Sequence, residues 1–272
     1  MTNNQIRKLS QSLILVRLLS GSSILLDYSL RWLFWYSLWL KELVKFSNPD
    51  PPPYTYEALK KPDHIRILLL HPTFGFRPIS CNLVQGPHMR RLNYEAISYT
   101  WGGMEATRQI MVDGCTMKVT ESVYEILTTY CSLLVPKLLW IDAVCIDQQN
   151  VEEKSLQVPL MQKIYREALF TTVFLGRAPT TACAVFDLFN EFEILKSGAL
   201  RHSVQTIYEL YETLQPTKSK PKQWDALLRL LQHPWFGRVW VVQEVALSQR
   251  VFVKYGDETI DWDVLASGLA RL

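Results

Sequence analysis

Three carboxylates are the side chains of this chain best placed to do chemistry. Asp142 and Asp147 frame a short segment that follows an apolar run, and Glu244 lies in an apolar stretch, four residues after Trp240. A carboxylate among apolar residues is costly to bury unless it is paired or functional. In an active site, such a group can transfer a proton or stabilise a developing positive charge.

Each carboxylate also has an ordinary structural explanation. Aspartates at strand ends often cap loops through local hydrogen bonds. On a helix, the spacing of Trp240 and Glu244 puts both on one face, and Arg238 is an available ion-pair partner for any of the three carboxylates. The residues alone therefore leave both a functional and a structural role open.

Other kinds of catalytic and metal site are not indicated. Cys145 has no histidine in a recognisable local pattern, so a buried structural cysteine is the favoured interpretation. The five histidines form no HxxxH or HExxH pair, and the chain has no P-loop, nucleophile elbow or GxGxxG, so we expect no metal and no bound cofactor. The five cysteines are widely spaced without a CxxC pair, which favours reduced thiols and a cytoplasmic location.

The elements around Asp142 and Asp147 read as one strand–helix–strand unit. Residues 138–142 form an apolar strand, Asn150 can cap a helix over 151–168, and residues 171–175 are rich in strand-forming types. Pro159 predicts a kink or a break within that helix. Two strands joined by a crossover helix are parallel, so the unit predicts an α/β sheet.

The sequence thus predicts an α/β fold with a mostly parallel central sheet flanked by helices. Ligands of such sheets bind beyond the carboxyl ends of the strands, where Asp142, Cys145 and Asp147 would sit. The glycines of the turn over residues 100–103 would let a ligand or another backbone segment approach closely. The other expected strands are 65–70, 80–84, 94–99 and 250–255, with a hairpin over 109–119 around Asp113-Gly114; the other expected helices are a capped one from Ser122 to about Cys131, helical segments within 180–214, and a helix over 224–231.

Length and composition describe an ordinary globular chain with an N-terminal addition. The chain has 272 residues, 48% of them hydrophobic and 20% charged, and its net charge of +3 is too small to indicate nucleic-acid binding. We expect an apolar helical segment over residues 1–47, a proline-rich linker over 48–53 and one domain over 54–272.

The apolar segment of residues 9–45 has two interpretations. Its longest charge-free stretches, 18–26 and 32–40, have nine residues each, whereas a spanning helix needs about 20 predominantly apolar residues. Flanking lysines and arginines and an aromatic cluster suit a helix that lies on a membrane surface. A helical hairpin packed on protein is the alternative, so membrane association stays open.

Three blocks of sequence together resemble the fungal heterokaryon incompatibility (HET) domain. The first block is YEAISYTWG from Tyr94 to Gly102, the second runs from LWIDAVCIDQQ at Leu139 to Leu175-Gly176, and the third is RVWVVQE from Arg238 to Glu244. They occur in the order of the family and cover roughly residues 92–247. The resemblance implies a role in fungal non-self recognition, in which the domain triggers programmed cell death.

The HET family is itself thought to be distantly similar to Toll/interleukin-1 receptor (TIR) domains, a form of innate-immunity module. That similarity implies a TIR- or flavodoxin-like core with a helical insertion. Trp240 and Glu244 reproduce the W-x-x-x-E spacing in which some TIR domains carry a glutamate that cleaves NAD. The resemblance therefore implies that Glu244 is catalytic and that NAD is a substrate and not a cofactor.

The same resemblance predicts the surroundings of Glu244. Residues 238–247 would begin a helix with Trp240 packed beneath it, and Glu244 would face a crevice. The predicted substrate-binding residues are Trp101, Gly102, Gly103, Asp142, Asp147, Arg238 and Trp240. The alternative is a death-signalling module without chemistry, which acts through self-association or through a partner signalling protein.

Overall fold

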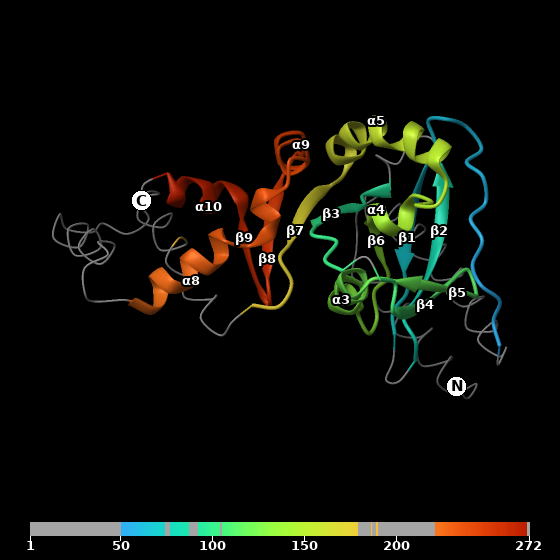
Figure 1. Cartoon of the computed structure of the whole chain (residues 1–272), viewed down its shortest axis with the longest axis horizontal. Coiled ribbons are helices and arrows are strands. Elements are labelled where there is room, and N and C mark those ends of the chain that lie inside the picture. Colours follow the sequence, from blue (N-terminus) through green and yellow to red (C-terminus); the bar gives the residue numbers. More distant parts are fainter. Residues whose placement is uncertain are drawn as a thin grey trace, which may run out of the picture. The chain divides into compact units, whose positions relative to one another are not determined.

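The computed structural model describes residues 50–73, 77–86, 92–103, 105–178, 186, 189 and 221–270. The chain divides between Asp50 and Pro51 into two compact units, and the fold below belongs to the unit that begins at Pro51 (Figure 1). The segment predicted to be helical and apolar over residues 1–47 lies outside the described residues, as does most of the region 180–214. Within the described ranges, no helix is both long and apolar enough to cross a membrane.

A sheet of nine strands forms the centre of this unit (Figure 1). Its strands lie side by side in the order β5-β4-β2-β1-β6-β3-β7-β8-β9. The bounds are β1 Ile65–Leu70, β2 Ser80–Gly86, β3 Glu95–Tyr99, β4 Arg108–Val112, β5 Cys115–Val119, β6 Lys137–Trp140, β7 Phe170–Phe174, β8 Val251–Tyr255 and β9 Glu258–Asp261.

The prediction of a mostly parallel sheet flanked by helices is wrong, because the sheet is mixed. The pairings β1–β2, β1–β6, β4–β5 and β8–β9 are antiparallel, whereas β2–β4, β3–β6, β3–β7 and β7–β8 are parallel. The strands of the predicted strand–helix–strand unit, β6 and β7, do both run parallel to β3 in this sheet.

Tight turns account for the antiparallel part of the sheet. Asp113 and Gly114 have φ angles of 53° and 83°, which suit the two-residue hairpin that joins β4 to β5. Gly256, with φ of 62°, lies in the turn between β8 and β9. The hairpin predicted over residues 109–119 belongs to the central sheet, because β4 pairs with β2, and the hairpin of β8 and β9 joins the same sheet through β7. Pro53 also bridges to Thr116 of β5, at the end of the predicted linker.

The helices are short except for one. Their bounds are α3 Glu121–Tyr130, α4 Asp142–Cys145, α5 Val151–Glu167, α8 Pro221–Leu231, the 3₁₀ helix η2 Pro234–Gly237, α9 Val241–Ala246 and α10 Trp262–Leu269. Asn150 caps α5 as predicted, because its side chain accepts a hydrogen bond from the Glu153 amide. Thr120 caps α3 in place of the predicted Ser122, and α5 continues through Pro159 as one helix.

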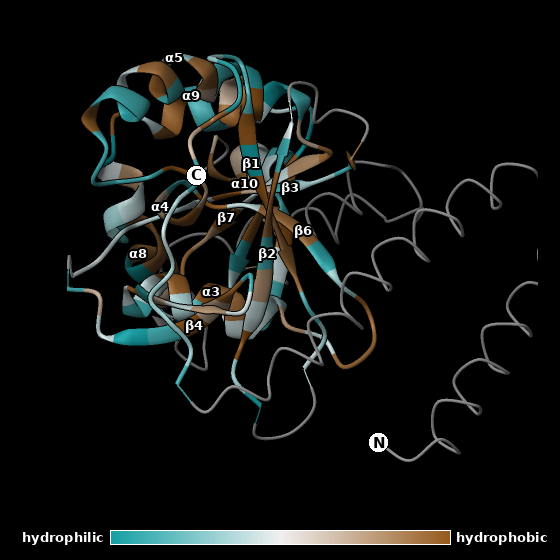
Figure 2. Ribbon diagram, turned by 90° about the vertical axis from the view of Figure 1, so that its right-hand side faces the viewer, coloured by the Kyte–Doolittle hydropathy of each residue, from teal (hydrophilic) through white to brown (hydrophobic). Residues whose placement is uncertain are grey.

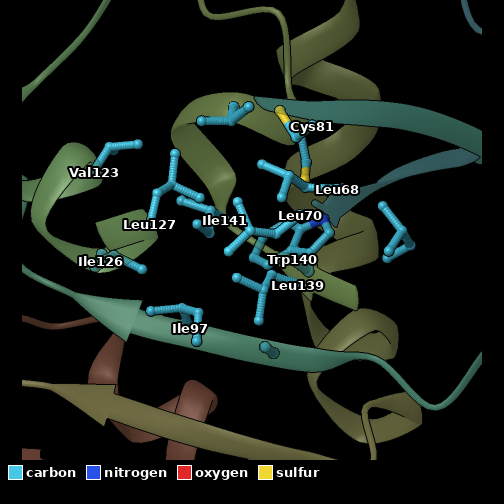
Figure 3. Close-up of a cluster of buried hydrophobic side chains, with 14 of the residues drawn as sticks. Leu68, Leu70, Cys81, Ile97, Val123, Ile126, Leu127, Leu139, Trp140 and Ile141 are labelled. Carbon is cyan, nitrogen blue, oxygen red and sulfur yellow. The ribbon is translucent and has the colours of Figure 1, made fainter. Parts of the chain in front are cut away.

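Two hydrophobic clusters hold the sheet and the helices together, and apolar residues gather on the central strands (Figure 2). In the larger cluster, Trp140 of β6 packs among leucines of β1 and β6, close to Ile97 of β3 and to residues of α3 (Figure 3). The smaller cluster covers β7, β8 and β9 with α8, η2 and α10, and Trp235 is buried within it.

Strand β3 separates two sets of polar contacts, because its side chains alternate between the faces of the sheet. Glu95 accepts a hydrogen bond from the Tyr130 hydroxyl of α3. Tyr94 instead donates to the Ile164 carbonyl of α5, and Ser98 contacts Glu244 of α9. Helix α9 therefore lies on the face that carries α5, and the two helices are neighbours in both views (Figures 1 and 2).

A buried ion pair joins β1 to the start of α5. The Arg66 guanidinium donates to both carboxylate oxygens of Glu153, at 2.5 and 2.9 Å, and these side chains are 1% and 7% exposed. Arg66 also donates to the carbonyls of Glu57 and Cys145. The Glu153 carboxylate in turn accepts from the Asp147 amide. The pair therefore connects the backbone at Glu57 and the loop before α5 to the sheet.

Candidate functional site

Glu244 is buried in a polar cluster beyond the carboxyl ends of β3 and β6. Its side chain is 2% exposed. The Ser98 hydroxyl, at the end of β3, donates a hydrogen bond to Oε2 of Glu244. Oε1 lies 3.4 Å from Nη2 of Arg238, a long and weak contact for an ion pair. Glu244 is therefore held firmly on one oxygen and loosely on the other.

The pKa of Glu244 is raised above its ordinary value, mainly because burial disfavours the charged form. The hydrogen bond from Ser98 and the positive charge of Arg238 oppose this shift, and the nearby charge of Asp142 adds to it. Glu244 thus has the raised pKa common to buried catalytic carboxylates, which buried structural carboxylates can share.

Asp142 is the second carboxylate of the cluster. The Trp101 indole donates to its Oδ2 at 2.9 Å, and the Ala143 amide donates to its Oδ1 at 2.8 Å. Burial raises the pKa of Asp142, while these hydrogen bonds, the Tyr99 hydroxyl and the charge of Arg238 pull it down. The sequence prediction placed Asp142 at the end of a strand; in the structure β6 ends at Trp140, and Asp142 is the first residue of α4, separated from the strand by Ile141.

Arg238 contacts Glu244, lies close enough to Asp142 to affect its pKa, and has hydrogen-bonding capacity to spare. Its charge lowers the pKa of both Glu244 and Asp142. Its side chain is 23% exposed, yet Nη1 is buried and has no hydrogen-bond partner among the described residues. An arginine with an unused buried donor is ready to bind an anionic or hydroxyl group of a ligand.

Two tyrosines complete the cluster. The Tyr99 hydroxyl is close enough to Asp142 to affect its pKa, but it makes no hydrogen bond of ordinary geometry to a described residue. Burial and then the negative charges of Glu244 and Asp142 raise the pKa of Tyr165 on α5. Both phenols therefore remain protonated at neutral pH and can only act as hydrogen-bonding groups.

The structure brings together four of the eight predicted site residues, namely Glu244, Arg238, Asp142 and Trp101. Asp147 lies apart from them: its carboxylate accepts from the Gln149 amide and stays near Tyr56, which makes it a loop cap. The expectation that Trp240 packs beneath the helix is wrong, because Trp240 is 48% exposed and its carbonyl accepts from the Glu244 amide.

The glycine turn has a conformational role. Gly102 has φ of 65°, and a Cβ at this position would lie 2.8 Å from Oγ of Ser122, so the turn requires glycine. Gly103 has open space around it. This turn places the Trp101 indole against Asp142, because Ser122 donates to the Trp101 carbonyl and fixes the backbone there.

Sequence reasoning missed three side chains that shape the site, namely Ser98, Trp235 and Tyr165. The Trp235 indole donates to Oγ of Ser98 at 2.7 Å, so Trp235 reaches Glu244 through the serine. The sequence did contain a signal for the short helix that carries Trp235, because a proline such as Pro234 is typical of the first position of a helix. In the structure, His233 caps this helix and accepts a hydrogen bond from the Trp235 amide. Trp240 was predicted instead because the W-x-x-x-E spacing resembles that of TIR domains.

The arrangement suits a reaction that develops positive charge. Two carboxylates with raised pKa values face one arginine, with an indole and two phenols as hydrogen-bonding groups around them. Within the described ranges, no group of three or more His, Cys, Asp or Glu residues could hold a metal ion.

Comparisons with known proteins point to one family. The family model described as "Heterokaryon incompatibility protein (HET)" matches residues 94–244, which include Ser98, Asp142, Arg238 and Glu244. The curated protein "Heterokaryon incompatibility protein 6, OR allele" of Neurospora crassa is 32% identical over 251 residues, covering 79% of this chain. The chain spans only 36% of that relative's length. No solved structure matches significantly.

Proposed function

Because this chain belongs to the heterokaryon incompatibility (HET) family, we propose that it is a cell-death module of fungal non-self recognition that hydrolyses NAD at the nicotinamide–ribose bond. The observation that carries the proposal is the buried Glu244 carboxylate, which lies beside Asp142 and shares Arg238 with it. The W-x-x-x-E spacing of Trp240 and Glu244 suggested the same substrate.

The proposed chemistry needs a negative charge at the ribose. Nicotinamide leaves as a neutral molecule and takes the bonding electrons, so the ribose C1′ becomes an oxocarbenium-like centre. An ionised Glu244 stabilises that charge. Water then adds to C1′ and releases one proton, which gives ADP-ribose. The positive nicotinamide ring of bound NAD favours the ionised form of Glu244, because an opposite charge nearby lowers a carboxyl pKa.

The neighbours of Glu244 divide the remaining tasks. Asp142 already accepts hydrogen bonds from the Trp101 indole and the Ala143 amide, and its remaining lone pairs can accept a hydrogen bond from a ribose hydroxyl or the proton of the attacking water. Arg238 is the more weakly bound partner of Glu244, because their contact is 3.4 Å long and the arginine is partly exposed. Its displacement by substrate would open Glu244 to the ribose and turn the guanidinium toward the pyrophosphate of NAD.

Incubation of the full chain with NAD tests the proposal. We expect the wild type to release free nicotinamide, measured by liquid chromatography, and Glu244→Gln to lower the rate about 100- to 1,000-fold, as the loss of one electrostatic contact in a transition state typically does. Glu152→Gln is the matched control, since the same chemical change there affects an exposed side chain on α5.

Two outcomes would contradict the enzymatic proposal. The first is a wild type that releases no nicotinamide above the rate of buffer alone. The second is a Glu244→Gln protein that is folded and still kills the cells that express it. A loss of folding in Glu244→Gln, seen as a collapse of the thermal transition, would point to a purely structural carboxylate.

A second candidate function is a death-signalling module that acts by self-association or by binding a signalling partner, without catalysis. The observation in its favour is a run of exposed apolar side chains beside the site, namely Val239, Trp240 and Val242. Exposed apolar residues that lie together often mark protein contact sites.

Replacement of Trp240 and Val242 by serine separates the two functions. The interaction module predicts that this double variant loses killing and runs at a smaller mass in light scattering. The enzymatic module predicts that it keeps nicotinamide release. Glu244→Gln should lose nicotinamide release and keep the mass of the wild type in light scattering.

A further inference from the structure

A hydrogen-bonded chain of three residues ends on Glu244. The Trp235 indole Nε1 donates to Oγ of Ser98 at 2.7 Å, and the Ser98 hydroxyl donates to Oε2 of Glu244. Each of the three side chains is buried. The chain links η2, β3 and α9, which are distant in sequence, at one point.

The direction of the protons in this chain follows from the chemistry of the groups. An indole N–H is a donor only, so Ser98 must accept from Trp235. Ser98 has a single hydroxyl proton, and its other hydrogen-bonded neighbour is the Glu244 carboxylate, which accepts. Because the indole occupies one side of Oγ, the hydroxyl proton is directed at Oε2 of Glu244.

Trp235 is itself held rigidly. It is fully buried and packs edge-to-face against Phe236 and Trp262, at ring distances of 5.0 and 5.9 Å. Its backbone amide donates to His233, which fixes the start of η2. The indole N–H therefore cannot move away from Ser98 without disturbing the smaller hydrophobic cluster.

We propose that Trp235 and Ser98 are positioning residues for Glu244: the indole fixes the direction of the serine hydroxyl, and the serine holds the carboxylate, ionised and oriented, for reaction with substrate. This inference rests on the proposed function for its meaning in catalysis, but the hydrogen-bonded chain can be tested without any substrate.

The other groups that face Glu244 come from three further parts of the structure. Arg238 approaches Oε1 from the segment before α9, Asp142 contributes a negative charge from the end of β6, and Tyr165 lies against it from α5. Arg238 favours the ionised form of Glu244, while Asp142 disfavours it. Because the weak arginine contact lies on the other oxygen, Ser98 makes the strongest contact that keeps Oε2 in place.

The direct test is a pH titration of the Glu244 carboxyl carbon by NMR, in full chain labelled with ¹³C at the glutamate side-chain carboxyl. The signal missing from Glu244→Gln assigns the resonance. We expect Ser98→Ala to raise the measured pKa of Glu244 by about one unit, the size expected for loss of one hydrogen bond to a charged group.

Trp235→Phe keeps an aromatic ring and removes only the donor, so it should raise the same pKa by roughly half as much, because the freed hydroxyl can then rotate. Ser98→Thr keeps the hydroxyl and should restore the wild-type titration. Trp262→Phe, in the same aromatic cluster but without a contact to Ser98, is the matched control and should leave the titration unchanged.

Kinetics provide the second measurement. If the wild type cleaves NAD, Ser98→Ala and Trp235→Phe should lower kcat with little change in KM and shift the acid limb of the pH–rate profile upward, in step with the titration. Trp262→Phe should alter neither.

The inference is overturned if Glu244 titrates identically in the wild type, Ser98→Ala and Trp235→Phe. A wild type that does not cleave NAD would contradict the proposed function. The NMR titration would still decide whether the hydrogen bonds from Trp235 and Ser98 control the Glu244 carboxylate. A changed pKa of Glu244 with an unchanged kcat in Ser98→Ala and Trp235→Phe would show that these hydrogen bonds have a structural role only.

Discussion

In two arginine–glutamate pairs of this domain the glutamate is buried, but Arg66 of the first pair is also buried whereas Arg238 of the second is partly exposed. Arg66 and Glu153 are joined by two short hydrogen bonds. Both Nη atoms of Arg66 also donate to backbone carbonyls and Oε1 of Glu153 accepts from the Asp147 amide, so that only Nε of Arg66 lacks a partner among the described residues. Arg238 and Glu244 share one long contact of 3.4 Å, and Nη1 of Arg238 has no partner among the described residues.

The pKa values of the two glutamates shift in opposite directions. For Glu153, burial favours the neutral form, but the hydrogen bonds and charge of Arg66 and the Asp147 amide outweigh it and lower the pKa. For Glu244, burial wins and the pKa is raised. A pair joined by two short hydrogen bonds and several backbone contacts stabilises the fold, whereas a pair joined by one long contact keeps bonding capacity for a ligand.

The largest expected effect is on stability at the first pair. Arg66→Met leaves the Glu153 carboxylate buried without its partner, which should cost about 3–5 kcal/mol in the free energy of unfolding. Urea denaturation measures this cost. The double variant Arg66→Met/Glu153→Met should recover most of the loss, since an apolar pair of similar volume replaces the ions. A single variant as stable as the wild type would refute the structural role.

The next largest effect is on the rate of nicotinamide release, which should differ between variants of Asp142 and Asp147. Asp142→Asn should lower nicotinamide release about 10- to 100-fold, because the site loses one of its two charges. Asp147→Asn should leave the rate unchanged, since Asp147 only caps the loop before α5. Equal losses in both variants would show that the loop, and not the Asp142 charge, supports the reaction.

A smaller effect is expected on stability at the second pair. Arg238→Met should cost less than about 1 kcal/mol, because the contact with Glu244 is long and the arginine is partly exposed. The same urea titration used for Arg66→Met gives the comparison. A cost as large as that of Arg66→Met would place both pairs in one structural class.

The smallest effect is the pH dependence of the melting temperature. Because the pKa of Glu153 is lowered in the folded state, its contribution to the free energy of unfolding is complete above the unfolded-state pKa of about 4.3. That contribution is lost as the pH falls through the pKa of the folded state. The raised pKa of Glu244 means the reverse: stability is lost as the pH rises through its folded value. Glu244→Gln should therefore melt slightly above the wild type at neutral pH and together with it near pH 4.

Much of the local structure could be predicted from the sequence. The strand over 65–70, the Asp113-Gly114 hairpin and the Asn150 cap rest on local rules of turns and caps, and the structure has all three. The sheet as a whole could not be predicted. Pairings such as β1 with β6 join strands that are far apart in sequence, and the pattern of each strand does not specify its neighbour.

The site shows the same division. Glu244 was found because a carboxylate in an apolar setting is unusual, and Asp142 because it ends a predicted strand, where ligands of open sheets bind. Trp235 was missed because a buried indole and an exposed one look alike in sequence, and Ser98 because a small polar residue in a strand is unremarkable. Both are recognisable only when β3, η2 and α9 are placed together.

The separation of these residues along the chain has a consequence for the timing of activity. Ser98 and Glu244 lie 146 positions apart, and β3, which carries Ser98, pairs with β6 and β7. During synthesis, the ribosome releases Ser98 long before Glu244, so a growing chain carries no assembled carboxylate cluster. If the domain acts as proposed above, its activity can begin only after Glu244 has been synthesised and has packed against Ser98. In a refolding experiment, activity should appear with the slowest phase, because contacts between distant segments form late.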